Sequence, residues 1–100
     1  MKTPKVHEGD FVLIKWIDAA QERTEPVWVD IKTAKELSVN MPIVFACGFV
    51  IQNSSSMITV AQVHDGISED EGTVVGLFHV PWGCVVRIKV IMSKKELVSF

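Results

Sequence analysis

The chain of 100 residues contains no tyrosine, only two cysteines and six glycines scattered along its length. The lack of tyrosine disfavours a tyrosine-lined groove for peptides. Cys47 and Cys84 cannot build a disulfide framework and belong to no CxxC pair, so we interpret them as reduced thiols buried in strands. Without a glycine-rich run, the chain also has no loop of the kind that holds phosphate groups.

Long apolar runs and an excess of positive charge are missing as well. The longest uncharged apolar run covers residues 41–51, about half of the ~20 residues that a membrane-spanning helix requires. Residues 1–10 contain no apolar stretch typical of a secretory signal, so we expect a cytoplasmic protein without a membrane segment. The net charge of −2 is unlike that of most nucleic-acid-binding proteins, which neutralise phosphates with a basic face.

Hydrophobic residues, by contrast, make up 48% of the chain, which is a high share for one small domain. A domain of this size has a limited interior and buries roughly 60–70% of the surface of its unfolded chain. We therefore expect part of the apolar surface to meet another subunit or a partner.

Five runs rich in β-branched and aromatic residues predict five β-strands. They cover residues 11–18, 42–52, 57–63, 73–80 and 84–92. The first two runs are apolar on both faces, so each should be covered on both sides or lie at an interface. Gly48, in the middle of the second run, indicates a bulge or a sharp bend. A tight break at Pro81-Trp82-Gly83 joins the last two runs, which we expect to pair and close the sheet on itself.

One helix is predicted over residues 30–38. Asp30 can accept hydrogen bonds from the free N–H groups of the first turn, and Ile31, Ala34 and Leu37 form a narrow apolar stripe. Because a helix of about two turns is not stable alone, we expect it to pack on the sheet.

The fold class that follows is mainly β: a small five-stranded, strongly bent antiparallel barrel with one short helix after the first strand. The barrel domain is predicted to cover residues 11–92, between an N-terminal tail of residues 1–10 and a C-terminal tail of residues 93–100.

The segment Gly76-Leu77-Phe78, followed by Pro81 and Cys84-Val85-Val86, resembles the end of an SH3-like barrel. In such barrels a one-turn 3₁₀ break precedes the last strand, and Pro81-Trp82-Gly83 would supply that break. The resemblance implies an SH3-like barrel over most of residues 11–92. The acidic first loop and the tyrosine-rich groove of signalling SH3 domains are absent, so the resemblance does not extend to binding of proline-rich ligands.

A more distant resemblance is to Sm-like barrels. Gly48-Phe49-Val50-Ile51 and Ile58-Thr59-Val60-Ala61 are similar to their bent strand pair. The arginine of the closing Sm segment and the Asp-x-Asn signature of the uridine pocket are missing, so the resemblance gives little support to RNA binding.

The overall pattern is also similar to short proteins encoded by phages and prophages, a family without an assigned activity. The shared features are Trp16-Ile17-Asp18, Trp28 before Ala34-Lys35-Glu36-Leu37, a central Gly-Phe-Val strand, and Pro and Gly before the last strand. This resemblance implies a phage or prophage origin, in the cytoplasm of the host cell or associated with the virion.

No pattern predicts catalysis, a cofactor or a resident metal, and we predict that the protein is not an enzyme. His7, His64 and His79 do not have the close spacing of a zinc motif. A zinc site from Cys47, Cys84 and His79 is one alternative, and Cys84 as a nucleophile with His79 or His64 as its base is another.

The acidic stretch at residues 65–71 leaves two interpretations open. Its carboxylates could bind a divalent cation, although they lack the regular alternation of an EF-hand loop. A solvated loop that protects a sheet edge is the second interpretation. The carboxylates are those of Asp65, Glu69, Asp70 and Glu71.

Two functions compete at this point. The first is a protein-interaction or assembly module that self-associates, as a homo-oligomer, or docks to a larger assembly, because tryptophan is enriched at the centres of interfaces. Its candidate contact residues are Trp16, Trp28, Trp82 and Phe78. The alternative is an Sm-like nucleic-acid-binding protein, with cations on the strands and Trp82 or Phe78 stacking on bases. Its candidate residues are Lys15, Arg87 and Lys89.

Overall fold

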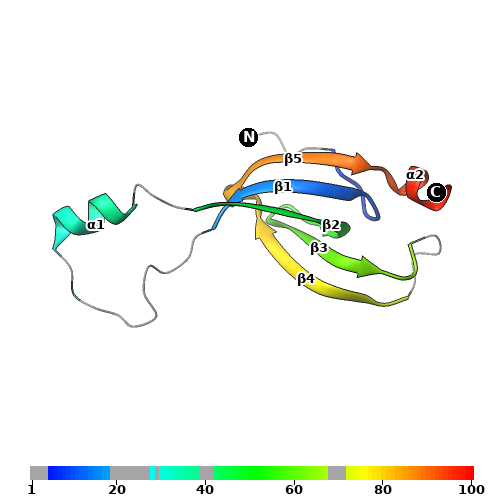
Figure 1. Cartoon of the computed structure of the whole chain (residues 1–100), viewed down its shortest axis with the longest axis horizontal. Coiled ribbons are helices and arrows are strands. Elements are labelled where there is room, and N and C mark those ends of the chain that lie inside the picture. The colour runs from blue at the N-terminus through cyan, green and yellow to red at the C-terminus, as the bar shows by residue number, and fades with distance from the viewer. Residues whose placement is uncertain (1–4, 19–27, 29, 39–41, 68–71) are drawn as a thin grey trace.

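The computed structural model describes residues 5–18, 28, 30–38, 42–67 and 72–100 (Figure 1). Their elements follow in the order β1 (Phe11–Ile17), α1 (Ile31–Ser38), β2 (Ile43–Asn53), β3 (Met57–His64), β4 (Val74–Pro81), η1 (Trp82–Cys84), β5 (Val85–Met92) and α2 (Lys94–Val98). The prediction of five strands is confirmed, and each predicted limit lies within one residue of the observed one. The predicted break before the last strand is the 3₁₀ helix η1.

The five strands form one antiparallel sheet in the order β4-β3-β2-β1-β5. β4 and β5 lie at opposite ends of this order, so the sheet is open, and the prediction that these two strands pair and close a barrel is wrong. The reason lies in η1, where the backbone N–H of Trp82 donates to the carbonyl of Ser56 at 3.1 Å. The break is thereby bound to the β2–β3 turn instead of forming a hairpin.

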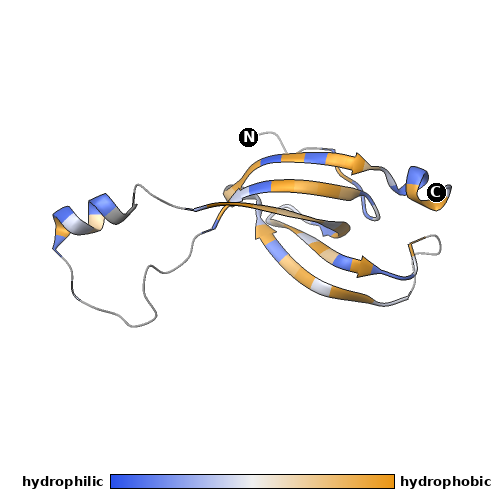
Figure 2. Ribbon diagram, viewed as in Figure 1, coloured by the Kyte–Doolittle hydropathy of each residue, from blue (hydrophilic) through white to orange (hydrophobic). Residues whose placement is uncertain are grey.

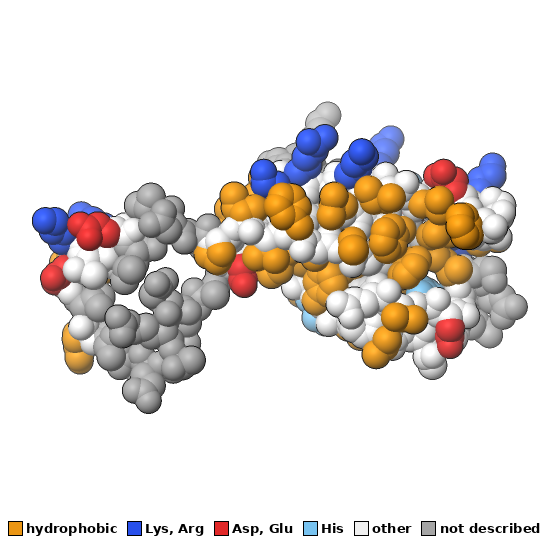
Figure 3. Space-filling model, viewed as in Figure 1, with side chains coloured by type: hydrophobic (Ala, Val, Ile, Leu, Met, Phe, Trp, Pro, Cys, Tyr) orange, Lys and Arg blue, Asp and Glu red, His pale blue; other side chains and the backbone are white. Residues whose placement is uncertain are grey.

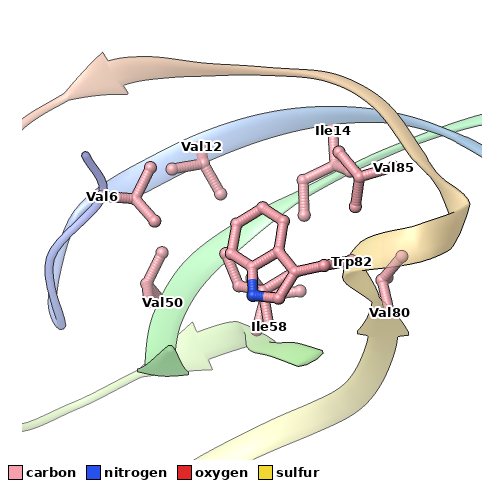
Figure 4. Packing of buried hydrophobic residues seen from close by; sticks show 9 residues of the cluster. Val6, Val12, Ile14, Val50, Ile58, Val80, Trp82 and Val85 are labelled. Carbon is pink, nitrogen blue, oxygen red and sulfur yellow. The ribbon is translucent and has the colours of Figure 1, made fainter. Parts of the chain in front are cut away.

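The sheet folds over on itself, so that β1 and β5 face β3 and β4 across the hydrophobic core (Figure 1). The core residues come from all five strands, from η1 and from the N-terminal segment, and they are Val6, Val12, Ile14, Val50, Ile58, Val60, Val80, Trp82 and Val85. Trp82 lies among the other core side chains (Figure 4). Its indole N–H donates to the carbonyl of Ser54 at 2.9 Å, so the ring is held by packing and by a hydrogen bond.

Residues 5–10, predicted as part of a tail, pack against the sheet. Val6 is buried in the core, and the Val6 carbonyl accepts a hydrogen bond from the side-chain amide of Asn53. Asp10 is 5% exposed, and its carboxylate accepts the backbone N–H groups of His7 and Lys94, both at 3.0 Å. One buried carboxylate therefore ties the beginning of the domain to its end, which stabilises both segments because charge-assisted hydrogen bonds are strong.

The C-terminal segment, predicted as a tail, contains a short helix, α2. Its start is a capping box: the Ser93 hydroxyl accepts the Glu96 backbone N–H, and the Glu96 carboxylate accepts the Ser93 backbone N–H. These bonds, the backbone one first, hold the pKa of Glu96 below its usual range. The Ser-x-x-Glu spacing is a known sequence signal for a helix start, so this element was predictable.

Helix α1 begins as expected but does not pack on the sheet. The Asp30 carboxylate accepts the backbone N–H of Thr33 at 2.7 Å, and this cap lowers the pKa of Asp30. Ile31, on the predicted stripe, is 74% exposed, and α1 lies apart from the sheet (Figures 1 and 2). The expected packing is therefore wrong, since so narrow a stripe offers little apolar area to bury against the sheet.

Candidate functional site

The surface that stands out is the side of the sheet that points away from the core, which we call the outer face. β1 and β2 are hydrophobic along most of their length (Figure 2), so they place apolar side chains on this face as well as in the core. Phe45 on β2 is 63% exposed and Leu77 on β4 is 53% exposed. Other exposed apolar residues of the outer face are Leu13, Ile43, Met57, Val63 and Val75. They gather over the strands (Figure 3), and such gatherings mark interaction sites.

The strand register brings the three predicted cations together at one border of this face. Lys15 lies opposite Arg87, and Leu13 lies opposite Lys89, in the β1–β5 ladder. With Phe45 these residues line a shallow hollow of about 290 Å³. Figure 3 shows Lys and Arg side chains in a row beside the apolar surface. We call this set of five residues the cationic hollow.

The charges of the cationic hollow are not neutralised inside the described part of the chain. Among the described residues, no carboxylate lies in salt-bridge contact with Lys15, Arg87 or Lys89. The Lys15 Nζ lies 6.0 Å from the centre of the Phe45 ring, at the outer limit of a cation–π contact. A hollow with an apolar ring and three cations is suited to a group that is both anionic and flat or apolar.

The four aromatic residues predicted as contacts have different surroundings. Trp82 is in the core, and Trp16 and Phe78 are partly buried and pack against it. The indole N–H of Trp16 is buried without a hydrogen-bond partner among the described residues, so packing alone holds that ring. Trp28 is fully exposed and is the only one of the four whose whole ring is open to solvent.

The exposed aromatic residue of the outer face, Phe45, was not among the predicted contacts. Its strand alternates apolar residues on both faces, and the period-two pattern does not say which face is covered. The available signal was the unbroken apolar run that contains Phe45, between Pro42 and a polar turn. A small domain covers only one face of such a strand, so the other face is exposed or covered by a partner.

The structure places the cysteines and histidines as follows. Cys47 is exposed on the outer face and Cys84 is half-buried in η1, so the prediction that both are buried in strands is wrong. The His79 Nδ1 lies 2.8 Å from the Thr59 hydroxyl oxygen, in hydrogen-bond contact. In the part of the chain that the structure describes, no three potential ligands are grouped to hold a metal, and the zinc alternative finds no support there.

The acidic stretch is described only in part. Asp65 accepts the backbone N–H of Thr73 at 2.6 Å and the Thr73 hydroxyl at 2.8 Å, and these bonds lower the pKa of Asp65. Both of its carboxylate oxygens are thus used to hold the start of β4. Glu69, Asp70 and Glu71 lie outside the described residues.

A second hollow, of about 260 Å³, lies beside the β3–β4 connection. Its two ionisable residues are Glu8 and His64, and the His64 Nδ1 accepts the backbone N–H of Gly66 at 3.1 Å. The second ring nitrogen of His64 and the Glu8 carboxylate are the ionisable groups left in this hollow, and no nucleophilic side chain lines it. The second hollow is therefore a weaker candidate for a binding site than the outer face.

None of the described helices has the length and apolar character needed to cross a membrane. Comparisons with protein-family models, with curated proteins and with solved structures gave no significant match to the chain. The geometry of the outer face is therefore the basis for a functional proposal.

Proposed function

We propose that the chain is a non-enzymatic interaction module that works by self-association or by docking to a larger assembly through the outer face of its sheet. The observation that carries this proposal is the exposure of large apolar side chains on that face, with Phe45 as the most exposed of those on the strands. The finer fold class, an SH3-like domain, and a phage or prophage origin belong to the same proposal. The strand order and the 3₁₀ turn between β4 and β5 support the SH3-like class, whereas the origin is proposed from the sequence resemblance alone.

The free energy available from burying the outer face is compatible with binding to another protein. Full burial of a Phe, Leu or Ile side chain is worth about 1.5–3 kcal/mol. Association costs about 4–15 kcal/mol in lost freedom of motion. Several exposed residues of the outer face must therefore be buried together, which favours a broad contact with a protein surface over the capture of a small ligand.

We expect the average mass to rise above the 11.1 kDa of one chain as protein concentration increases in a sedimentation series. Phe45→Gln should weaken this association because it removes the most exposed apolar group of the strands. Val98→Gln is the matched control, since Val98 is 51% exposed and lies on α2, not on a strand of the sheet. A chain that stays monomeric at high concentration, and that retains no protein when immobilised, would refute the proposal.

A second candidate function is binding of single-stranded nucleic acid, favoured by the convergence of Lys15, Arg87 and Lys89 around the Phe45 ring. Aromatic rings stack on bases while nearby cations contact the phosphates. The hollow itself offers one exposed ring, and the other two phenylalanine rings of this face, Phe11 and Phe49, are partly buried against each other with centroids 5.1 Å apart. We therefore place this function second.

If nucleic acid binds here, the logarithm of the binding constant should fall with the logarithm of salt concentration with a slope of about −2, from three phosphate contacts on a single strand. Replacing Lys15, Arg87 and Lys89 with glutamine should abolish a gel shift. The matched control replaces three cations outside the hollow, Lys5, Lys32 and Lys95, and makes the same change in net charge. Absence of a shift at low salt would exclude this function.

A further inference from the structure

The first half of β2, residues 43–47, has a neighbouring strand on one side only within the described part of the chain. β1 pairs with it in continuous register, from Ile17 opposite Ile43 to Leu13 opposite Cys47. β3 joins β2 only from Phe49 onward. The opposite side of this half-strand is therefore an open sheet edge, which we call the β2 edge.

The backbone groups that face the β2 edge follow from the antiparallel ladder. The N–H of Asp18 donates to the carbonyl of Pro42, and the N–H of Val50 donates to the carbonyl of Asp10. Hydrogen-bonded pairs alternate along such a ladder, so Val44 and Ala46 direct their backbone groups toward β1. The alternate residues of β2 direct their backbone N–H and C=O groups to the open side. These residues are Ile43, Phe45 and Cys47.

The other two edges of the sheet are protected, whereas the β2 edge is not. β4 contains Gly76 in a left-handed conformation (φ 75°) and ends in Pro81. β5 carries Arg87 and Lys89 and shifts register twice against β1. Irregular geometry, proline and charge are the usual means by which proteins prevent edge pairing. Residues 43–47 have a regular register, no proline and no charge.

We propose that the β2 edge binds the β2 edge of a second copy of this chain, antiparallel and about a two-fold axis at Phe45. In this register Phe45 pairs with its own symmetry mate and Ile43 pairs with Cys47 of the other copy. The inference rests on the proposed function and specifies how self-association occurs.

The β2 edge is self-complementary in hydrogen bonding and in charge. Ile43, Phe45 and Cys47 each offer one donor and one acceptor, so the pairing makes about six backbone hydrogen bonds between the copies. No charged side chain lies in the pairing segment, so like charges are not brought into opposition. The exposed side chains of the three residues also line up with one another across the junction, which buries apolar surface of the outer face.

The register is tested by a cross-link in the full chain with Ile43→Cys, Cys84→Ser and the natural Cys47 retained. Directly opposed residues of a hydrogen-bonded pair lie about 5.5 Å apart at Cα, within the range that a disulfide spans. Within one copy, positions 43 and 47 are about 13 Å apart along the strand, so a bond between them must join two copies. Mild oxidation should convert most of the chain to a covalent dimer on a non-reducing gel. The same chain with Cys47→Ser should stay monomeric. So should a chain with Cys47→Ser, Cys84→Ser and Leu77→Cys, in which position 77 carries the single cysteine.

A second variant tests the backbone. The Phe45 N–H points away from β1, so Phe45→Pro removes no hydrogen bond of the β1–β2 ladder, whereas it removes two of those between copies. We expect at least about a tenfold weaker dimer than for Phe45→Gln, which corresponds to 1.4 kcal/mol, with an unfolding midpoint in circular dichroism close to that of Phe45→Gln.

The outcomes separate this inference from the proposed function. If the wild-type chain self-associates but the 43–47 cross-link does not form, the pairing is wrong and the interaction module stands. If the wild-type chain is monomeric and the cross-link also fails, self-association is refuted, and only docking to another protein is left. Retention of another protein by the immobilised chain decides that last point.

Discussion

The Trp82→Ala variant is expected to lose about 3–5 kcal/mol of unfolding free energy, the range for deleting a large aromatic side chain from a core. Trp82 is the largest residue of the hydrophobic core, and its ring lies among side chains from the strands and from Val6 (Figure 4). Because a domain of this size has a total stability of about 5–15 kcal/mol, this loss is a large share of the total and should lower the urea midpoint strongly. Urea unfolding followed by far-ultraviolet circular dichroism measures the loss.

Trp28→Ala is the matched control, because Trp28 is fully exposed and the same atoms are removed. It should change the unfolding free energy by less than about 0.5 kcal/mol. Trp82→Phe separates the ring from its hydrogen bond to Ser54: it keeps most of the packing and should cost about 1–3 kcal/mol, because the Ser54 carbonyl loses its partner. If Trp82→Ala unfolds with nearly the wild-type midpoint, the central place of this ring in the core is refuted.

The second large effect is expected for Gly48→Ala. A Cβ atom at position 48 would lie 2.7 Å from the backbone carbonyl oxygen of Ala61, closer than real Cβ atoms come to such an oxygen. Because this neighbour is backbone in the centre of the sheet, relief requires β2 and β3 to separate. Overpacking of this kind typically costs about 1–3 kcal/mol, and we expect the upper end of that range.

Gly83→Ala is the control for Gly48→Ala. A Cβ atom at position 83 meets nothing within 4 Å, so the alanine should be neutral or should stabilise the protein by up to about 1 kcal/mol, through a less flexible unfolded chain. Both variants are compared by urea midpoints under the same conditions. Equal midpoints for the two would show that β3 does not approach Gly48 closely.

The number of strands and their limits could be predicted because each strand is a short run of β-branched and aromatic residues between turn residues. The cap at Asp30 and the 3₁₀ break at Trp82 could be predicted for a similar reason, since each depends on neighbouring residues alone. The docking of α1 was predicted wrongly, because whether Ile31 is buried depends on contacts distant in sequence. The prediction that β4 and β5 pair was wrong for the same reason, because strand pairing depends on contacts between residues distant in sequence.

The candidate site shows the same division. Lys15, Arg87 and Lys89 could be named from their positions on strands, but only the β1–β5 register places Arg87 beside Lys15 and Lys89 beside Leu13. Phe45 could not be ranked above Trp82 from the sequence. Both are large aromatic residues. The hydrophobic effect favours burial of either ring in proportion to its apolar area, so the sequence does not show which of the two is buried.

By itself, the sequence determined a mainly β domain of five strands, with an apolar content too high for its own interior. The tertiary structure decided which apolar face is covered. An alternating strand has two faces, and its period of two does not distinguish them. The folding over of the sheet, with Trp82 and Val6 placed on the inner side, buries one face and leaves Phe45 on the other. The same bend separates β3 from the first half of β2, and an open, uncharged edge results.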